Sequence, residues 1–355
     1  MGEDNDSPRP GFDFWASHKG QGKYYDTEFN INGKRQEVKG YYSHVVTDMA
    51  KDWIDRRDKR PFALMLGHKA PHGIWIPEKK YETVFDNVRI AKPKTAVPGP
   101  DKPEWVRERI GTWHGINGPL YGSKDYDTFV RTYHATILSV DDSIGELRAA
   151  LERAGELDNT IFIFASDSGF LLGEHGSIDK RVMWEESIRI PLMIRYPRGI
   201  RAGTKADRLV LNHDVAPTVL DLCGVPAKQP MQGRSLRPLL SGKPASDWRS
   251  SFFYEYNFED EFPYTPNVRG VRTARWKYIH YPNGEGQPET HKAELYDLQS
   301  DPQETRNLID AAEGREIAVS LKRELASLKK QFGAVPDRMP VNPKVRYENP
   351  KQSIR

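Results

Sequence analysis

Residues 162–180, FIFASDSGFLLGEHGSIDK, decide the fold and contain the first candidate site. An apolar run that ends in Ser166-Asp167-Ser168-Gly169 predicts a buried strand followed by a turn. Ligands bind at the carboxyl ends of strands in open α/β sheets, so we expect Asp167 at the mouth of a site. A carboxylate beside the Ser168 hydroxyl suits a hard cation such as Ca²⁺. The same residues also fit a capped turn followed by an ordinary surface loop.

Two further groups of polar residues could contact an anion. Gly173-Glu174-His175-Gly176 forms a loop with a titratable imidazole, and Lys180 supplies a compact cation. The second group, His68-Lys69-Ala70-Pro71-His72, directly follows the apolar run 61–67. These imidazoles and the amine suit an anion better than a metal, because no Cys or third His lies at ligand spacing. A loop with two solvated histidines accounts for the second group equally well.

The elements around these groups alternate between helix and strand. Apolar residues at helical spacing predict helices over 43–56, 129–151 and 214–222. Continuous apolar runs predict buried strands over 61–67, 161–165 and 190–195. A short hairpin is expected around Asn32-Gly33. The order of helices and strands indicates an α/β domain with a largely parallel sheet covered by helices.

The pattern changes beyond Asp247. Residues 252–256, 268–273 and 276–281 predict antiparallel strands, and the spacing from Ile317 to Phe332 predicts a terminal amphipathic helix. The expected division is an α/β domain over 1–245, a small antiparallel sheet with a helix over 246–340, and a tail over 341–355.

Composition argues against several classes of protein. The 355 residues carry a net charge of +3 with both signs mixed along the chain, so no nucleic-acid partner is indicated. No apolar run approaches the ~18–20 residues that span a bilayer, so no transmembrane segment is expected. The single cysteine, Cys223, excludes an internal disulfide. The polar N-terminal stretch contains no secretory signal.

A series of motifs along nearly the whole chain resembles the formylglycine-dependent sulfatase family of the alkaline phosphatase superfamily. Segments 19–32 and 179–181 are most similar to the N-acetylglucosamine-6-sulfatase-like branch. The resemblance implies a hydrolase that cleaves sulfate esters, with a sulfated sugar or glycosaminoglycan as substrate. The motifs that follow the family's order are 10–13, 69–77, 141–145, 166–180, 196–197, 214–218, 233–236, 294–298 and 301–308.

The resemblance also implies a role for each candidate residue. Asp167 matches the family's calcium-binding aspartate. Ser168 stands where the family has Asn or His, which removes a carbonyl or an imidazole from the metal shell. His72 matches the histidine that holds the sulfate and faces the leaving-group oxygen. Lys180 matches the sulfate-binding lysine, and His175 is similar to a substrate-side residue.

Other parts of the family's site have no match in these residues. The family's formylglycine nucleophile is made from Cys or Ser in Cys/Ser-x-Pro-x-Arg, but Pro226 lies one residue too far from Cys223, and Glu304 stands where Ser300-Asp301-Pro302 needs an arginine. We therefore expect a truncated chain that lacks the family's N-terminal third and has an incomplete calcium site. The full-length parent is expected to be exported to a periplasmic, extracellular or lysosome-like compartment.

Two alternatives to a sulfatase stay open. The 173–176 loop also occurs in phosphonate and phosphate ester hydrolases of the superfamily, although segment 19–32 disfavours them. The other alternative is a non-catalytic protein that keeps an anion pocket without a nucleophile.

Overall fold

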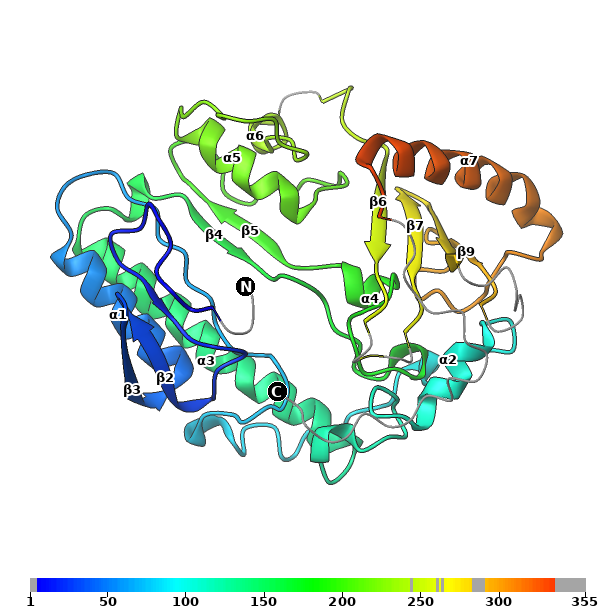
Figure 1. Ribbon diagram of the computed structural model, residues 1–355, viewed down its shortest axis with the longest axis horizontal. Coiled ribbons are helices and arrows are strands. Elements are labelled where there is room, and N and C mark those ends of the chain that lie inside the picture. The colour runs from blue at the N-terminus through cyan, green and yellow to red at the C-terminus, as the bar shows by residue number, and fades with distance from the viewer. Residues whose placement is uncertain (1–4, 243–244, 260–261, 263–264, 283–290, 336–355) are drawn as a thin grey trace. The chain divides into compact units, whose positions relative to one another are not determined.

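The computed structural model describes residues 5–242, 245–259, 262, 265–282 and 291–335. They fall into two compact units, drawn in Figure 1: the described residues of 1–91 and 120–160, and those of 92–119 and of 161 onward. The boundary predicted near residue 245 falls inside the second unit. The predicted tail 341–355 lies outside the described residues.

The first unit combines an antiparallel sheet with two helices. Strands β1 (Ala16–Ser17), β2 (Tyr25–Ile31) and β3 (Lys34–Tyr41) pair in that order, and the β2–β3 hairpin turns at Asn32-Gly33 as predicted. Helices α1 (Tyr42–Arg56) and α3 (Tyr126–Arg153) confirm two predicted helices and lie side by side (Figure 1). Buried serine and threonine hydroxyls join the two helices, with Ser43 3.0 Å from Ser139.

The strand predicted over 61–67 is wrong. This segment has no regular secondary structure and forms no ladder with a described strand, and Met65 is 88% exposed. An apolar run becomes a strand only where a neighbour satisfies its backbone donors and acceptors. No strand in the described part of the chain provides that partner.

The second unit contains the two strands predicted on either side of the candidate loop. β4 (Phe162–Ala165) and β5 (Leu192–Arg195) pair antiparallel, from Phe162 opposite Arg195 to Ala165 opposite Leu192. The mixed α/β class is confirmed, but every ladder among the described residues is antiparallel, so the largely parallel sheet is not seen there. The connection 166–191 returns the chain to the same end of the sheet, which makes its two strands antiparallel. The connection ends in the short helix α4 (Glu185–Ile188).

The predicted C-terminal antiparallel sheet and its helix are also present in this unit. Strands β6 (Ser251–Tyr256), β7 (Val268–Thr273), β8 (Trp276–His280) and β9 (Glu294–Asp297) pair in sequence order. Helix α7 (Arg315–Phe332) covers one face (Figure 1). Neighbouring residues of a strand enter opposite cores: Tyr278 packs with α7, and Ile279 packs on the other side.

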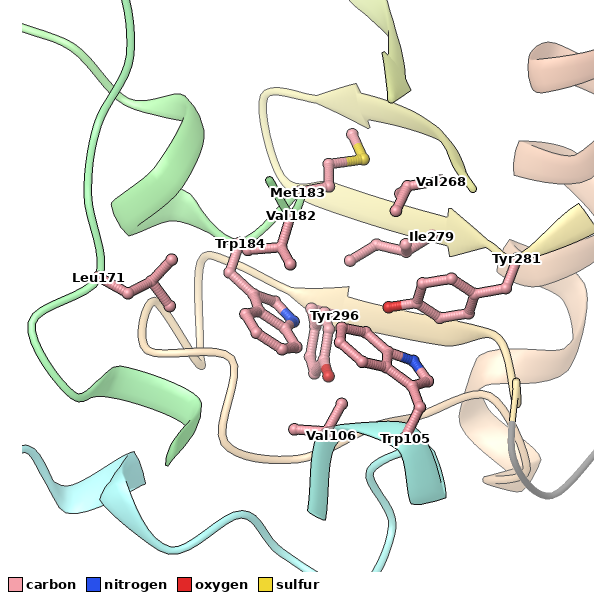
Figure 2. Packing of buried hydrophobic residues seen from close by; sticks show 10 residues of the cluster. All are labelled: Trp105, Val106, Leu171, Val182, Met183, Trp184, Val268, Ile279, Tyr281 and Tyr296. Carbon is pink, nitrogen blue, oxygen red and sulfur yellow. The ribbon is translucent and has the colours of Figure 1, made fainter. Parts of the chain in front are cut away.

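The core on the other side of this sheet holds the segment that contains Lys180. Trp105 of α2 (Glu104–Glu108) stacks on Trp184, with ring centroids 5.9 Å apart and planes 6° apart. Figure 2 shows these indoles beside Tyr296 of β9. Leu171, Val182 and Met183 belong to the same core, so residues on both sides of Lys180 are packed against the C-terminal sheet.

The remaining helices are short, and they include α5 (Val215–Leu222), which confirms the helix predicted over 214–222, and α6 (Arg237–Leu240). Among the described helices, none combines the length and the apolarity that crossing a bilayer requires.

Candidate active site

Asp167 lies in a tight loop directly after β4. Its side chain is exposed, and its Oδ1 accepts a hydrogen bond from the Ser168 backbone N–H at 2.9 Å. The Ser166 hydroxyl closes the loop by donating to the Ser168 carbonyl at 2.8 Å. Gly169 then passes so close to α4 that a Cβ would lie 2.1 Å from the Glu186 carbonyl oxygen. The loop thus presents a carboxylate at the end of a strand, as the sequence predicts.

Lys180 is half-buried and follows a fully buried ion pair. The carboxylate of Asp179 lies 2.5 Å from Nη2 of Arg109 and 2.7 Å from Nη1 of Arg181. Burial by itself would raise the pKa of Asp179, but the two guanidinium groups hold that pKa well below its usual range. Asp179 is therefore an anion that fixes the backbone directly before Lys180 by two strong contacts.

His175 lies in the interior of the second unit, with 0% of its surface exposed. Its ring packs on Trp184 with centroids 4.4 Å apart, and its Nε2 lies 3.5 Å from Oε2 of Glu186. Burial, together with the nearby Lys102 ammonium, places the pKa of His175 well below its ordinary value, so the imidazole is neutral. Its position does not support the expectation that this side chain contacts a substrate.

His72 belongs to the first unit, in a segment fixed by backbone contacts. Tyr24 donates its hydroxyl to the His72 carbonyl at 2.8 Å, and the His72 N–H donates to the Lys69 carbonyl at 2.7 Å. Nδ1 of His72 lies 2.7 Å from the Gly73 carbonyl oxygen. Because a carbonyl only accepts, Nδ1 carries a proton, and Nε2 can donate a second one when the ring is cationic.

Lys69 accompanies His72 in the same segment. Its ammonium lies 5.0 Å from the centroid of the Tyr24 ring and 3.2 Å from the Gln21 carbonyl. Partial burial lowers the pKa of Lys69. The amine and the imidazole predicted to lie close together are thus both held by contacts with residues 21–24.

Two groups of side chains in the described part of the chain have the spacing of metal ligands. His44, Glu78 and Asp142 form one in the first unit, and His175, Glu186 and Glu304 form the other in the second. Each already has a lysine as its cation: Lys80 lies 2.7 Å from Asp142, and Lys277 lies 2.7 Å from Glu304.

Neither of these groups contains Asp167, the predicted metal ligand. The oxygen donors of Asp167 and Ser168 fit a hard cation in kind, and they would supply part of the roughly six to eight oxygens that Ca²⁺ takes.

Comparison with known proteins identifies the family. The sulfatase family model matches residues 2–225, and the model for the C-terminal part of N-sulphoglucosamine sulphohydrolase matches residues 173–331. An N-acetylglucosamine-6-O-sulfatase of Bacteroides thetaiotaomicron is 34% identical over 91% of this chain and 68% of its own length. The chain therefore belongs to the sulfatase family, a family of sulfuric ester hydrolases that are in general metal-dependent.

Further relatives agree with that family. Human N-acetylglucosamine-6-sulfatase is 34% identical over 70% of this chain, which spans 46% of the human protein. A solved structure of a protein in complex with its substrate, D-glucosamine-2-N,6-O-disulfate, superposes with a TM-score of 0.84 at 33% identity, covering 92% of this chain and 78% of that one. A phosphonate monoester hydrolase of Agrobacterium radiobacter shares the fold, with a TM-score of 0.68 at 23% identity.

Sequence reasoning missed the buried network beside the candidate loop. Lys277 of β8 is fully buried and lies 2.8 Å from Glu185 and 2.7 Å from Glu304. Although the ammonium of Lys277 opposes it, burial raises the pKa of Glu304 to about 6. The match of 301–308 to a family motif was the only signal for Glu304, and it carried no information about a partner.

Proposed function

We propose that this protein hydrolyses sulfate esters of sulfated amino sugars, with 6-O-sulfated glucosamine as the substrate class. The observation that supports this most is the superposition of 92% of the chain, at 33% identity, on a structure that contains D-glucosamine-2-N,6-O-disulfate. We infer that this chain uses the fold it shares with that protein to hydrolyse a related sulfate ester.

In this proposal, the charged side chains act on the sulfuryl group. A sulfate ester carries one negative charge, and charge builds on the bridging oxygen as the S–O bond breaks. Lys180 stabilises a non-bridging oxygen, and His72, in its cationic form, donates a proton toward the leaving group from Nε2. Asp167 and Ser168 would contribute oxygen ligands to a Ca²⁺ ion, which would supply positive charge to stabilise the transition state.

The proposal requires a nucleophile that residues 1–355 do not encode, because they contain no Cys/Ser-x-Pro-x-Arg sequence for a formylglycine. Positioned charges do not replace a covalent step. Residues 1–355 expressed alone are therefore expected to release sulfate from N-acetylglucosamine-6-sulfate no faster than buffer does.

The test uses the protein expressed from its complete gene, with sulfate release from N-acetylglucosamine-6-sulfate as the assay. Lys180→Ala and His72→Ala should each lower kcat by about 10²-fold or more, because each removes a positioned transition-state donor. The exposed Lys228→Ala and His213→Ala serve as matched controls and should stay within twofold of wild type.

Two outcomes would contradict the proposal. Lys180→Ala and His72→Ala with the kinetics of the two control variants would remove both residues from the reaction. Faster hydrolysis of a phosphonate monoester than of the sulfate ester would favour the phosphonate hydrolases that share this fold.

A further inference from the structure

The buried residue Ser187 contacts both segments of the candidate site. Its backbone carbonyl accepts a hydrogen bond from the Gly169 N–H at 2.8 Å, directly after Asp167-Ser168. Its side-chain Oγ donates to the Lys180 carbonyl at 2.5 Å. Ser187 is 3% exposed, so neither contact competes with bulk water. One residue of α4 thus joins the carboxylate loop to the lysine that follows it by 13 positions along the chain.

Helix α4 is itself fixed to the C-terminal sheet. The backbone N–H of Glu185, the first residue of α4, donates to Oε2 of Glu304 at 2.7 Å. The Glu185 side chain lies 2.8 Å from the Lys277 ammonium and 3.1 Å from the Arg272 guanidinium. Both arginine and lysine belong to strands of that sheet, β7 and β8. The buried ion pairs therefore hold one end of α4, and Ser187 lies two residues further along the helix.

The backbone of the loop that contains Asp167 also lies very close to the backbone carbonyl groups of α4. A Cβ at Gly169 would meet the carbonyl oxygens of Glu186, Ser187 and Arg189 at 2.1, 2.9 and 3.0 Å. Such close backbone contact allows only glycine. The loop that contains Asp167 is thus seated on α4 by shape as well as by the hydrogen bond to Ser187.

We propose that Ser187 is a positioning residue that sets the place of Lys180 relative to Asp167. Helix α4, which the hydrogen bond and ion pairs fix to the C-terminal sheet, holds Ser187 in place. The proposal rests on the proposed function only in that it takes Lys180 as the residue that holds the sulfate. The hydroxyl acts through the Lys180 carbonyl and never touches the substrate. Its loss leaves that carbonyl without its donor and lets the Lys180 backbone shift, and a small misplacement of a charged donor is costly in a preorganised site.

The experiment measures two properties of the protein expressed from its complete gene: the Kd for inorganic sulfate by calorimetry, and sulfate release from N-acetylglucosamine-6-sulfate. Ser187→Ala should weaken both sulfate binding and kcat about 10-fold, and Ser187→Thr, which keeps the hydroxyl, should restore most of the loss. Ser139→Ala is the matched control, because Ser139 is also fully buried and its Oγ donates to a backbone carbonyl, that of Thr136 at 2.9 Å.

A double-mutant cycle separates positioning from general stability. If Ser187 acts through Lys180, Ser187→Ala should cost nothing further in a Lys180→Ala background. Losses that multiply in the double variant, or a Ser187→Ala variant that behaves like Ser139→Ala, would overturn the inference while leaving the proposed function intact. A Lys180→Ala variant with wild-type kinetics would overturn the proposed function instead.

Discussion

The second unit contains two sets of strands that differ in how well they are covered. In the C-terminal sheet, all four residues of β9 are buried, and Ile279 of β8 has no exposed surface. In β4 and β5, no residue is fully buried, and Met193 is 60% exposed. β4 (FIFA) is the more apolar run and β9 (ELYD) the more buried one, so composition does not explain the difference.

The difference lies in what packs on each sheet. The C-terminal sheet has α7 on one face and the Trp105–Trp184 core on the other. β4 and β5 pair only with each other among the described residues. An apolar run forms a strand where another strand pairs with it, but the burial of that strand depends on segments that are distant in sequence.

The largest expected effect is the difference in unfolding free energy between two matched side-chain truncations, one in each sheet. Ile279→Ala should lower the free energy of unfolding by about 2–5 kcal/mol, because it leaves a cavity in a closed core. Met193→Ala should change it by less than about 0.5 kcal/mol, because that side chain is already mostly in water. Urea unfolding, with hydrogen exchange of β8 to locate the change, measures both. Equal losses in the two variants would show that β4 and β5 are as well covered as the C-terminal sheet.

A second prediction concerns Glu185 of α4, whose carboxylate pairs with Lys277 and Arg272 of the C-terminal sheet. Burial alone would raise the pKa of Glu185, but Lys277 and Arg272 lower it to about 2 from 4.5. Because the folded-state pKa is depressed, the ionised Glu185 stabilises the fold above about pH 4.5 and loses that contribution as the pH falls toward 2. With its side chain 16% exposed, the contribution is about 2–3 kcal/mol.

Glu185→Gln isolates this contribution from other acids that titrate in the same range. The difference in unfolding free energy between wild type and Glu185→Gln should be constant from about pH 6 down to pH 4.5 and then shrink as the pH falls to 3. Urea midpoints at each pH measure it. A difference that stays constant down to pH 3 would show that Glu185 is not paired in the folded protein.

The part of the fold that could be predicted from the sequence is the part that depends on local pattern. Helix α3 and strands β6 to β8 follow from residue periodicity, a local signal. Strand β9 does not, because it begins and ends with Glu294 and Asp297, and an acidic end argues against a buried strand. Glu294 is tolerated there because Lys102, Tyr281 and Tyr296 satisfy its carboxylate. Only Tyr296 is local, two residues along the same strand, whereas Lys102 lies 192 positions away in the chain.

The candidate site shows the same limit. The position of Asp167 after a strand follows from local pattern, and Lys180 follows from a family motif. The contacts that fix α4 next to these residues do not follow from local pattern, because Glu304 and Glu185 are 119 positions apart in the chain. The burial of His175 could not be predicted for a related reason: nothing in Gly173-Glu174-His175-Gly176 indicates that Trp184 will cover the ring.

The smallest expected effect lies at an exposed ion pair, which has the same chemistry as the Lys277 network without its burial. Arg56 lies 3.0 Å from Asp52 one turn earlier in α1, with side chains 79% and 64% exposed. Water screens such a pair, and ordering two long side chains offsets much of its attraction. Asp52→Asn should therefore change the free energy of unfolding by less than about 0.5 kcal/mol, and added salt should reduce even that difference. Urea unfolding at low and high ionic strength measures it. A loss comparable to that of Glu185→Gln would mean that burial does not decide what an ion pair contributes in this protein.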